Sequence, residues 1–364
     1  GLGDKISMQK AVQAIQSKTD EKRQDLDDLS FQEWLEINGQ SKRAISRFWN
    51  PISKLALNVD SSKSSAASAI FLFRKALLGK ANALDVGCFT NDFSSAVSSS
   101  LRRTLAASGV EVHLSSSATI LFREAGIVTG VKTREAFFAA DRVIICTPIA
   151  ETARLLTGSS ASIKSHEVAE NLAKLGNTSQ IGIHAFHEGP ILPEGIPFVT
   201  CCDEPMIQML FDRSGELDDG NRDGLPGHWI CTPVSHADDY LHWDDELIQT
   251  EYERVIGSAF PNSPALLEFH VVRKNRSATS MTTGSQRLRP SPIDAGQGVI
   301  LGGDWIDIEW PSSLEGATRA GLVAAATLLR EIGASEFEDW HHDEKWPDWP
   351  NPAFEEDYNW RIWK

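Results

Sequence analysis

The chain contains 364 residues, of which 41% are hydrophobic and 23% are charged, so it is long enough to bury a substantial core. Its formal net charge of -15 repels nucleic-acid phosphates and so argues against a nucleic-acid partner. Five cysteines without regular spacing argue against a disulfide framework. No signal peptide is evident, and no stretch approaches the roughly 18 apolar residues of a membrane-spanning helix, so we expect a cytoplasmic protein.

The first part of the chain, residues 1–80, is expected to be helical. Ser30 stands where it can cap a helix, and Glu33 occupies the capping-box position three residues later. Residues 43–57 place apolar side chains close to helical spacing, with Pro51 expected to kink or restart the helix. A further apolar helix is expected over residues 66–78.

The pattern then changes to a compact α/β block over residues 81–150. A helix closed by Gly109 is followed by short runs that are typical of strands. The last of these runs is apolar throughout, which is typical of a buried parallel strand. The expected helix covers residues 101–108, and the expected strands cover 110–114, 118–123, 126–131 and 140–146.

Residues 151–297 are more mixed and are expected to form a substrate domain together with the N-terminal helices. Strands are expected at 181–186, 208–211, 228–232 and 268–273, a helix at 244–260 and a loop at 220–227. The adjacent cysteines Cys201 and Cys202 allow a strained vicinal disulfide, but a strand with one reduced thiol on each face is favoured.

The most informative stretch combines an apolar strand, two glycines, an aspartate, a short loop and a helix start within residues 299–317. Glycines at a strand end let a ligand approach the backbone, and an aspartate can accept hydrogen bonds from sugar or ribityl hydroxyls. A helix start offers unpaired N–H groups and the positive end of the helix dipole, which suit a ligand atom that gains negative charge. The pattern therefore predicts a ligand site at this point.

This stretch resembles the C-terminal FAD signature of the amine oxidase/phytoene desaturase superfamily, and most closely its squalene-associated branch, the hydroxysqualene dehydroxylases. Further segments similar to that branch lie between residues 30 and 330: the helical segment around Phe48-Trp49-Asn50-Pro51, the Gly109–Val131 segment, and Arg276–Thr279 with Arg289-Pro290. The signature itself consists of Gly302-Gly303-Asp304-Trp305 followed by Trp310 to Gly321.

The resemblance implies FAD as the cofactor and assigns roles to several positions. Asp304 would bind the ribityl or pyrophosphate part of FAD, Gly303 would give backbone access, and N–H groups near Ser313 and Leu314 would face the flavin N1/O2 edge. Ala118 stands where the family's backbone holds adenine, although valine is commoner there. The complete set of implied FAD-binding residues is Ala118, Thr147, Pro148, Gly303, Asp304, Pro311, Ser313, Leu314 and Glu315. For Glu315, capping of its own helix is an equal alternative to cofactor contact.

One departure from the family pattern concerns the pyrophosphate. The family begins with a strand, a G-x-G-x-x-G turn and a helix, and no such glycine spacing occurs in this sequence. We therefore expect an incomplete FAD-binding unit that binds FAD weakly or not at all by itself. The missing part is expected to be about a hundred residues, the usual size of a dinucleotide-binding half.

The expected fold is mixed α/β: an incomplete Rossmann-like FAD-binding domain of the amine oxidase type, built from residues 81–150 and 298–332, with a helical and β-sheet substrate domain. Residues 333–364 are expected to form a tryptophan-rich acidic tail, in which His341 to Glu344 are solvated and bind no metal. The tail is a candidate for peripheral membrane contact.

The resemblance implies an FAD-dependent oxidoreductase that exchanges hydride between flavin N5 and an apolar isoprenoid substrate of the squalene type. An amine oxidase or carotenoid desaturase is the first alternative, and a non-catalytic remnant without the dinucleotide-binding half is the second. No residue stands out as a catalytic acid or base, and the sequence does not predict the oligomeric state.

Overall fold

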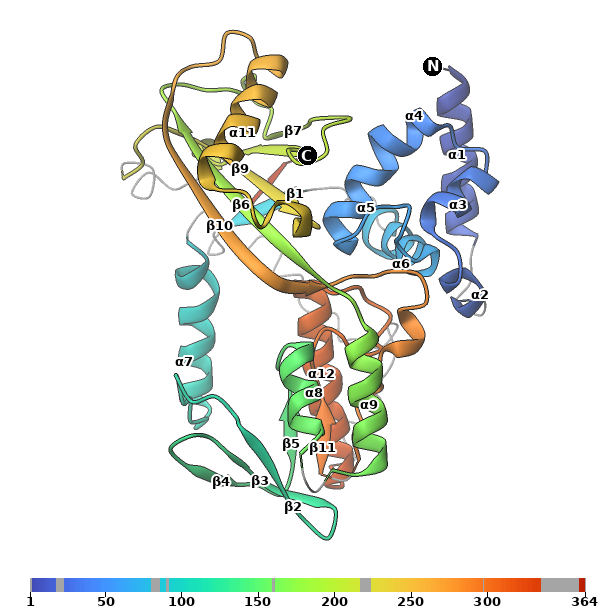
Figure 1. Cartoon of the computed structure of the whole chain (residues 1–364), viewed down its shortest axis with the longest axis vertical. Helices are drawn as coiled ribbons and strands as arrows, with labels where there is room; N and C mark the ends of the chain where they lie inside the picture. The colour runs from blue at the N-terminus through green and yellow to red at the C-terminus, as the bar shows by residue number, and fades with distance from the viewer. Residues whose placement is uncertain are drawn as a thin grey trace.

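The computed structural model describes residues 2–17, 23–79, 86–89, 92–158, 161–216, 224–296, 298–334 and 360–363. Apolar side chains in these ranges form three separate cores. One core lies in the N-terminal helices, one around a small parallel sheet, and one under a five-stranded antiparallel sheet. Figure 1 shows the helices on one side of the molecule and the large sheet on the other, above the parallel pair. The expected mixed α/β fold is confirmed.

Short helices build the first core, as expected for this part of the chain. Their buried aromatic side chains pack on one another, with Trp49 in edge contact with both Phe31 and Phe73. Pro51 lies in the first turn of its helix, directly after a π-helical turn at Ile45–Trp49, so the expected interruption is present. The helices are α1 (Leu2–Gln16), α2 (Arg23–Asp27), α3 (Phe31–Ile37), α4 (Lys42–Ala44), α5 (Asn50–Leu57) and α6 (Ala66–Phe71), which a second π-turn extends over Leu72–Leu77.

The predicted capping box at the start of α3 is present. The Ser30 hydroxyl accepts a hydrogen bond from the Glu33 N–H at 3.1 Å, and the Glu33 carboxylate accepts one from the Ser30 N–H at 2.8 Å. These bonds satisfy backbone groups that a helix start otherwise leaves unpaired, in the part of the helix that carries buried Phe31.

We therefore expect Ser30→Ala to lower the free energy of unfolding by about 1 kcal/mol. The exposed serine Ser62 offers a matched control, and Ser62→Ala should change the same quantity by less than about 0.5 kcal/mol. Urea denaturation followed by circular dichroism measures both values. Equal effects of the two substitutions would show that the capping box does not stabilise the core.

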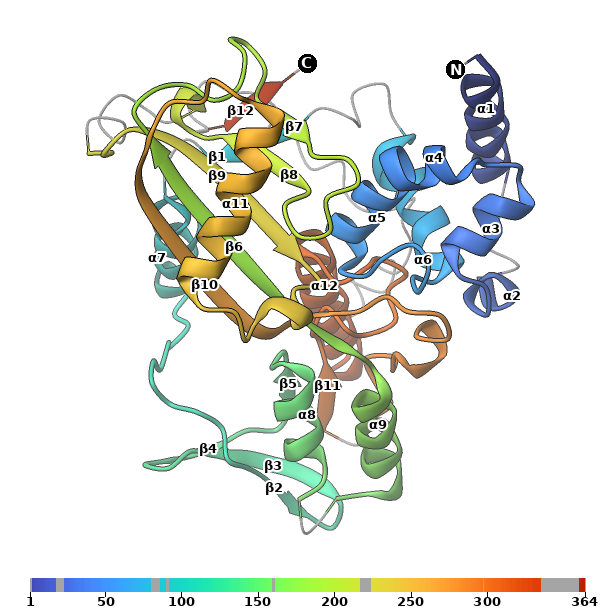
Figure 2. The same ribbon diagram turned by 45° about the horizontal axis from the view of Figure 1, so that its top comes forward.

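The five-stranded antiparallel sheet has the order β10-β6-β9-β8-β7. Helix α11 (Asp245–Ala259) lies across one face of it, as Figure 2 shows, and buries Ile248, Tyr252 and Val255. The four expected strands and the expected helix are confirmed, and β7 is an additional strand. The strands are β6 (Asn177–His187), β7 (Phe198–Thr200), β8 (Met209–Asp212), β9 (His228–Ser235) and β10 (Leu266–Thr279). Residues 220–223 of the expected loop lie outside the described residues.

Cys201 and Cys202 follow β7 and carry free thiols, so no vicinal disulfide forms between them. The expectation that they lie in a strand is wrong, because β7 ends at Thr200 and, after one more hydrogen bond from the Cys201 N–H to the Gln208 carbonyl at 2.8 Å, the backbone turns at Cys202. Burial raises the pKa of the Cys201 thiol to about 11, which keeps it protonated near neutral pH.

The second core surrounds two parallel strands, β5 (Val143–Ile145) and β11 (Val299–Leu301). The expected parallel strand is confirmed for β5, although Ile144 remains 39% exposed. Three helices pack around these strands: α12 (Leu314–Glu331), α8 (Ile149–Leu156) and α9 (Ile163–Lys174). Nearly all of α8 and all of α9 belong to the 151–297 unit that the sequence predicts as part of the substrate domain. The core thus joins segments that lie more than a hundred residues apart in the chain.

A three-stranded antiparallel sheet adjoins this core, with β2 (Ile120–Glu124), β3 (Ile127–Lys132) and β4 (Phe137–Ala139). The expected strand at 110–114 is wrong, because that segment pairs with no described strand and leaves its apolar side chains exposed. The expected helix before it is confirmed as α7 (Ser99–Ala107), which follows a π-turn at Ser94–Ser98. Gly109 follows with a φ of 73°, a conformation that glycine adopts without steric cost.

The end of the chain contributes one short strand, β12 (Trp360–Trp363), which pairs antiparallel with β1 (Val86–Phe89). The remainder of the tryptophan-rich tail, including His341 to Glu344, lies outside the described residues. Within the described ranges, no helix is both long enough and apolar enough to cross a membrane. Single 3₁₀ turns complete the list of elements, at Ser214–Glu216, Asp238–Tyr240 and Gln286–Leu288.

Candidate functional site

The segment from Leu301 to Ala317, here called the cradle, begins where β11 ends. Leu301 is fully buried, and the Gly302 N–H donates to the carbonyl of Ile145 at 2.9 Å, which continues the pairing with β5. A Cβ atom on Gly302 would stand 2.9 Å from the Cys146 sulfur and 3.0 Å from the Ala324 side chain. Glycine is therefore required where the two strand ends and α12 meet.

The carboxylate of Asp304 is partly exposed and is held from one side. The Ser312 hydroxyl donates a short hydrogen bond to it, and the Ser312 oxygen in turn accepts the N–H of Thr279 at 3.3 Å. Thr279 is the last residue of β10, so this chain of hydrogen bonds ties the cradle to the large sheet. The carboxylate keeps capacity for further donors, because each ionised carboxyl oxygen accepts more than one hydrogen bond.

The space beside Gly303 is filled by the indole of Trp305. A Cβ atom on Gly303 would lie 2.1 Å from the Trp305 Nε1 atom, and that N–H donates to the Thr147 carbonyl at 3.0 Å. Trp305 is 2% exposed and belongs to the second core. Glycine at this position therefore makes room for the tryptophan, in addition to any role in admitting a ligand.

The buried side chain of Arg289 holds the loop of the cradle in place. Its guanidinium donates to the carbonyls of Trp305 at 3.3 Å, Asp304 at 3.1 Å and Trp310 at 2.8 Å, and the residue is only 5% exposed. In the sequence, Arg289-Pro290 stands out only as part of a segment similar to the family, which does not by itself indicate this role. The sequence clue to this role was an arginine that precedes the signature. The role itself depends on hydrogen bonds to carbonyls 15 to 21 residues later.

The N-terminal end of α12 closes the cradle. The Ser313 hydroxyl accepts the Gly316 N–H at 3.0 Å and so caps the helix, and it donates to the Pro311 carbonyl at 3.1 Å. Within the described ranges, no acceptor is recorded for the N–H groups of Leu314 and Glu315. The helix start therefore keeps donors for a ligand.

The side chain of Glu315 bonds within its own helix rather than to the loop. Its carboxylate accepts from Arg319 at 2.7 Å, and the Arg319 guanidinium lies over the Trp310 ring at 4.4 Å. The indole N–H of Trp310 is buried, and no partner is recorded for it in the described part of the chain. The ring itself contacts Phe71 of α6 edge-on at 5.4 Å, which links the cradle to the N-terminal helices.

The remaining predicted residues lie at the two ends of α8. Thr147 and Pro148 precede the helix, where the Thr147 carbonyl receives Trp305 and partial burial raises the pKa of the neighbouring Cys146 thiol. Ala118 lies near the other end, because its carbonyl accepts from Arg154 at 2.8 Å. The structure thus joins Thr147 to the cradle through Trp305, whereas Ala118 is joined to α8 through Arg154 and packs against the second core.

These groups fit the flavin and ribityl part of FAD. The cradle offers the partly exposed Asp304 carboxylate for hydroxyl groups and two helix N–H donors for an atom that gains negative charge. The Ala118 carbonyl, which the resemblance assigns to adenine, accepts a hydrogen bond from Arg154 of α8 in this structure. The residues for the pyrophosphate cannot be assigned, because the sequence has no G-x-G-x-x-G turn.

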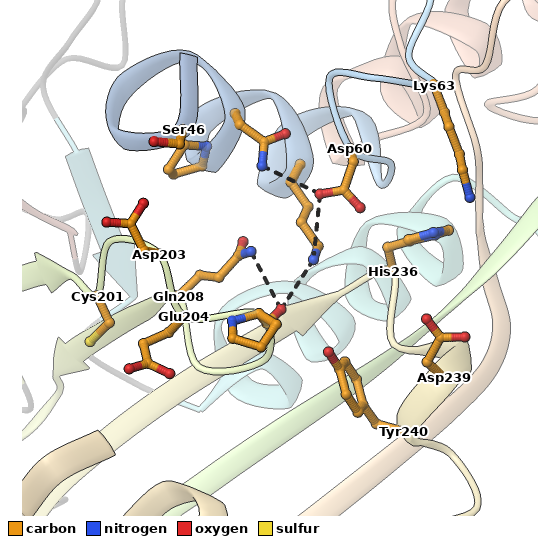
Figure 3. Close-up of a pocket in the computed structure, with 14 residues that line it drawn as sticks. Ser46, Asp60, Lys63, Cys201, Asp203, Glu204, Gln208, His236, Asp239 and Tyr240 are labelled. Carbon is orange, nitrogen blue, oxygen red and sulfur yellow. Dashed lines mark hydrogen bonds and ion pairs between the residues drawn. The ribbon is translucent and has the colours of Figure 1, made fainter. Parts of the chain in front are cut away.

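A polar cavity of about 350 Å³, here called the seam cavity, lies between α5 with its following turn and the loops at 201–208 and 236–240 (Figure 3). Its described lining contains no aliphatic side chain other than proline. A second cavity of about 560 Å³ lies at the other end of the sheet, and its lining combines prolines, Leu192 and Ile196 with polar side chains, namely Glu194, Asp212, Ser214 and His228. The two cavities therefore suit ligands of different polarity.

Comparison with known proteins gives one family match and two curated relatives. The model of the family described as flavin containing amine oxidoreductase matches residues 4–329. A hydroxysqualene dehydroxylase of Rhodopseudomonas palustris is 26% identical over 38% of this chain and 30% of its own length. A hydroxysqualene dehydroxylase of Sinorhizobium fredii is 24% identical over 78% of this chain and 62% of its own length. The chain thus spans less than two thirds of either relative.

Solved structures agree in fold at lower sequence identity. A putrescine oxidase bound to putrescine has a TM-score of 0.67 at 15% identity, with 91% of this chain and 76% of that chain covered. The cyclohexylamine oxidase of Brevibacterium oxydans has a TM-score of 0.62 at 14% identity, with coverage of 90% and 74%. An oxidoreductase of Methanosarcina mazei has a TM-score of 0.63 at 16% identity, with coverage of 88% and 72%.

Proposed function

Because the chain belongs to the flavin containing amine oxidoreductase family, we propose that its protein is an FAD-dependent oxidoreductase whose flavin lies against the cradle. The observation that carries this proposal is the convergence of the Asp304 carboxylate and the free N–H groups at the start of α12. FAD supplies the two-electron exchange with the substrate when it is bound. The protein's own residues bind and orient it.

Each part of the cradle has a distinct task in this proposal. Asp304 accepts hydrogen bonds from the hydroxyls of the ribityl chain, while Ser312 fixes the carboxylate. The N–H groups of Leu314 and Glu315 donate to the N1/O2 edge of the flavin, where the helix dipole favours negative charge. Arg289 holds the loop between these groups in one conformation by engaging its carbonyls.

The substrate that we propose is an isoprenoid lipid of the squalene type. Support comes from the curated relatives, both of which are named hydroxysqualene dehydroxylase. Replacement of a hydroxyl group by hydrogen is a two-electron reduction, so such a substrate takes electrons from the flavin. We propose that the protein contacts membrane surfaces peripherally, because an apolar substrate of this size is held in membranes.

Flavin spectroscopy of the full gene product tests the proposal. We expect a yellow protein that releases FAD on denaturation, and whose chemically reduced flavin is re-oxidised without oxygen by hydroxysqualene. If putrescine or a carotenoid precursor reduced the oxidised flavin instead, the substrate would be an amine or a carotenoid and not the proposed isoprenoid. A colourless product that releases no flavin would refute the proposed cofactor and favour the non-catalytic remnant.

A further inference from the structure

The seam cavity has a built polar lining that the flavin proposal does not use. Lys54 belongs to this lining and has a side chain that is 8% exposed. Its ammonium donates to the Pro205 carbonyl at 3.3 Å and lies 3.6 Å from the Asp60 carboxylate. Both contacts are long for a charged donor, and an ammonium has three hydrogens to donate. The cavity therefore contains a buried cation with capacity for another acceptor.

The opposite wall is held in an unusual backbone conformation. His236 has a φ of 55°, which is uncommon for a residue with a side chain. Its Nδ1 atom lies 3.1 Å from the Thr178 hydroxyl, and the Asp238 carboxylate accepts hydrogen bonds from that hydroxyl at 2.7 Å and from the Ser179 N–H at 3.2 Å. Strain of this kind persists where surrounding contacts fix it, and it is common at ligand sites.

Two further polar groups of that wall face the cavity. Tyr240 packs edge-on against Trp243 at 5.1 Å, and Figure 3 shows its hydroxyl directed into the cavity. Burial raises the pKa of Tyr240, so the hydroxyl stays neutral and can both donate and accept. Asp239 is exposed beside it. The wall thus presents a carboxylate, a hydroxyl and an imidazole together.

Most charges of the lining already have partners. Asp203 pairs with Arg47 at 2.8 Å, Glu204 pairs with Arg254, and Asp60 contacts Lys54. In the part of the chain that the structure describes, no ion pair is recorded for Lys63 or Asp239. Figure 3 shows Lys63, in the turn after α5, above His236, and Asp239 on the wall below. One cation and one anion thus remain on opposite walls.

We infer that the seam cavity binds a small zwitterionic ligand that carries one ammonium and one carboxylate group, as an amino acid does. Its carboxylate bonds to Lys63 and Lys54, and its ammonium bonds to Asp239 and the Tyr240 hydroxyl. A simple cation would face two lysines, and a simple anion would face Asp60 and Asp239. A zwitterionic ligand forms favourable charge pairs with both walls, because its carboxylate lies near the lysines and its ammonium lies near Asp239.

Isothermal titration calorimetry of the full chain with amino acids of graded length tests this inference. The probes are glycine, 4-aminobutyrate and 6-aminohexanoate, each compared with the diamine and the dicarboxylate of matching length. We expect one amino acid to bind at least about tenfold more tightly than its matched diamine and dicarboxylate, since each lost charged hydrogen bond weakens binding by at least that factor. Equal affinity for the three classes, or no saturable binding up to about 10 mM, would overturn the inference.

Substitution of the two exposed charges locates the site. We expect Lys63→Met and Asp239→Asn each to weaken binding of the best amino acid by about tenfold or more. Lys63→Met should also lose the preference for the amino acid over the diamine, and Asp239→Asn the preference over the dicarboxylate. Lys132→Met and Asp141→Asn, at exposed positions remote from the cavity, are the matched controls and should change nothing. Binding that survives both cavity substitutions would contradict the assignment.

The test is independent of the flavin. Because neither substituted residue belongs to the cradle, FAD content and melting temperature should stay at the level of the unmodified protein in both cavity variants. Amino-acid binding to a protein without flavin would support the seam site and refute only the proposed function. A flavin-containing protein that binds no probe would refute only the seam site.

Discussion

Asp304→Ala is expected to abolish stable flavin binding while the fold persists. The substitution removes the one carboxylate of the cradle that is fixed by Ser312 and still partly exposed. Hydrogen bonds to a charged group contribute about 1.5–3 kcal/mol each, so the dissociation constant of FAD should rise by about 10- to 100-fold or more. Released flavin after gel filtration, measured by absorbance at the flavin band, gives the result directly.

Two further substitutions separate loss of the carboxylate from damage to the loop. Ser312→Ala removes the hydroxyl that fixes the carboxylate but leaves the charge, so we expect a smaller loss of affinity. Asp307→Ala changes an exposed carboxylate three residues along the same loop, and flavin content should remain unchanged. If Asp304→Ala retained its full complement of flavin, Asp304 would not belong to the site.

Arg289→Met is expected to destabilise the protein and to disorganise the cradle. The guanidinium is buried and donates to three carbonyls, and the substitution leaves those acceptors without their donor. Each buried group left unpaired costs about 1–3 kcal/mol, so the free energy of unfolding should fall by about 3 kcal/mol or more. Guanidinium denaturation measures this value, and limited proteolysis should show faster cleavage between residues 304 and 310.

The neighbouring Arg287 supplies the matched control. It is 63% exposed at its side chain and pairs with Asp28 at 3.0 Å on the surface. Exposed ion pairs contribute about 0–1 kcal/mol, so Arg287→Met should have little effect. Arg289→Lys should fall between the two variants, because an ammonium keeps the charge but cannot reach several carbonyls as a planar guanidinium does. A similar small effect for both methionine variants would show that Arg289 does not hold the loop.

Features determined by neighbouring residues could be predicted from the sequence. The capping box of α3 depends on two residues three positions apart, and the end of α7 depends on one glycine. The strand, glycine pair and helix start of the cradle also lie within about twenty residues, so their order was visible without a structure. Local chemistry determines these elements wherever the rest of the chain lies.

Strand pairing was harder to predict, since it depends on a partner. The alternating segment 110–114 has the pattern of a strand but no partner in the described part of the chain. A second partner of β3, beside β2, is Phe137–Ala139, where two adjacent aromatic residues offered only a weak signal. Alternation therefore predicts strands only where another strand is available.

The contacts that organise the candidate sites join distant parts of the chain. Nothing near Arg289 indicates that it binds carbonyls 15 to 21 residues later, and nothing near Gly303 indicates that Trp305 fills the adjacent space. The conformation of His236 depends on Thr178 and Ser179, which lie almost sixty residues earlier. Such contacts arise from tertiary packing, which a single sequence does not display.

Hydrogen–deuterium exchange of the full gene product, with its flavin bound and after the flavin has been stripped, tests the central proposal most directly. If the cradle holds the flavin, amide exchange should slow on flavin binding within residues 301–317, above all at Leu314 and Glu315. Flavin binding that protects other segments and leaves 301–317 unchanged would contradict the proposed site.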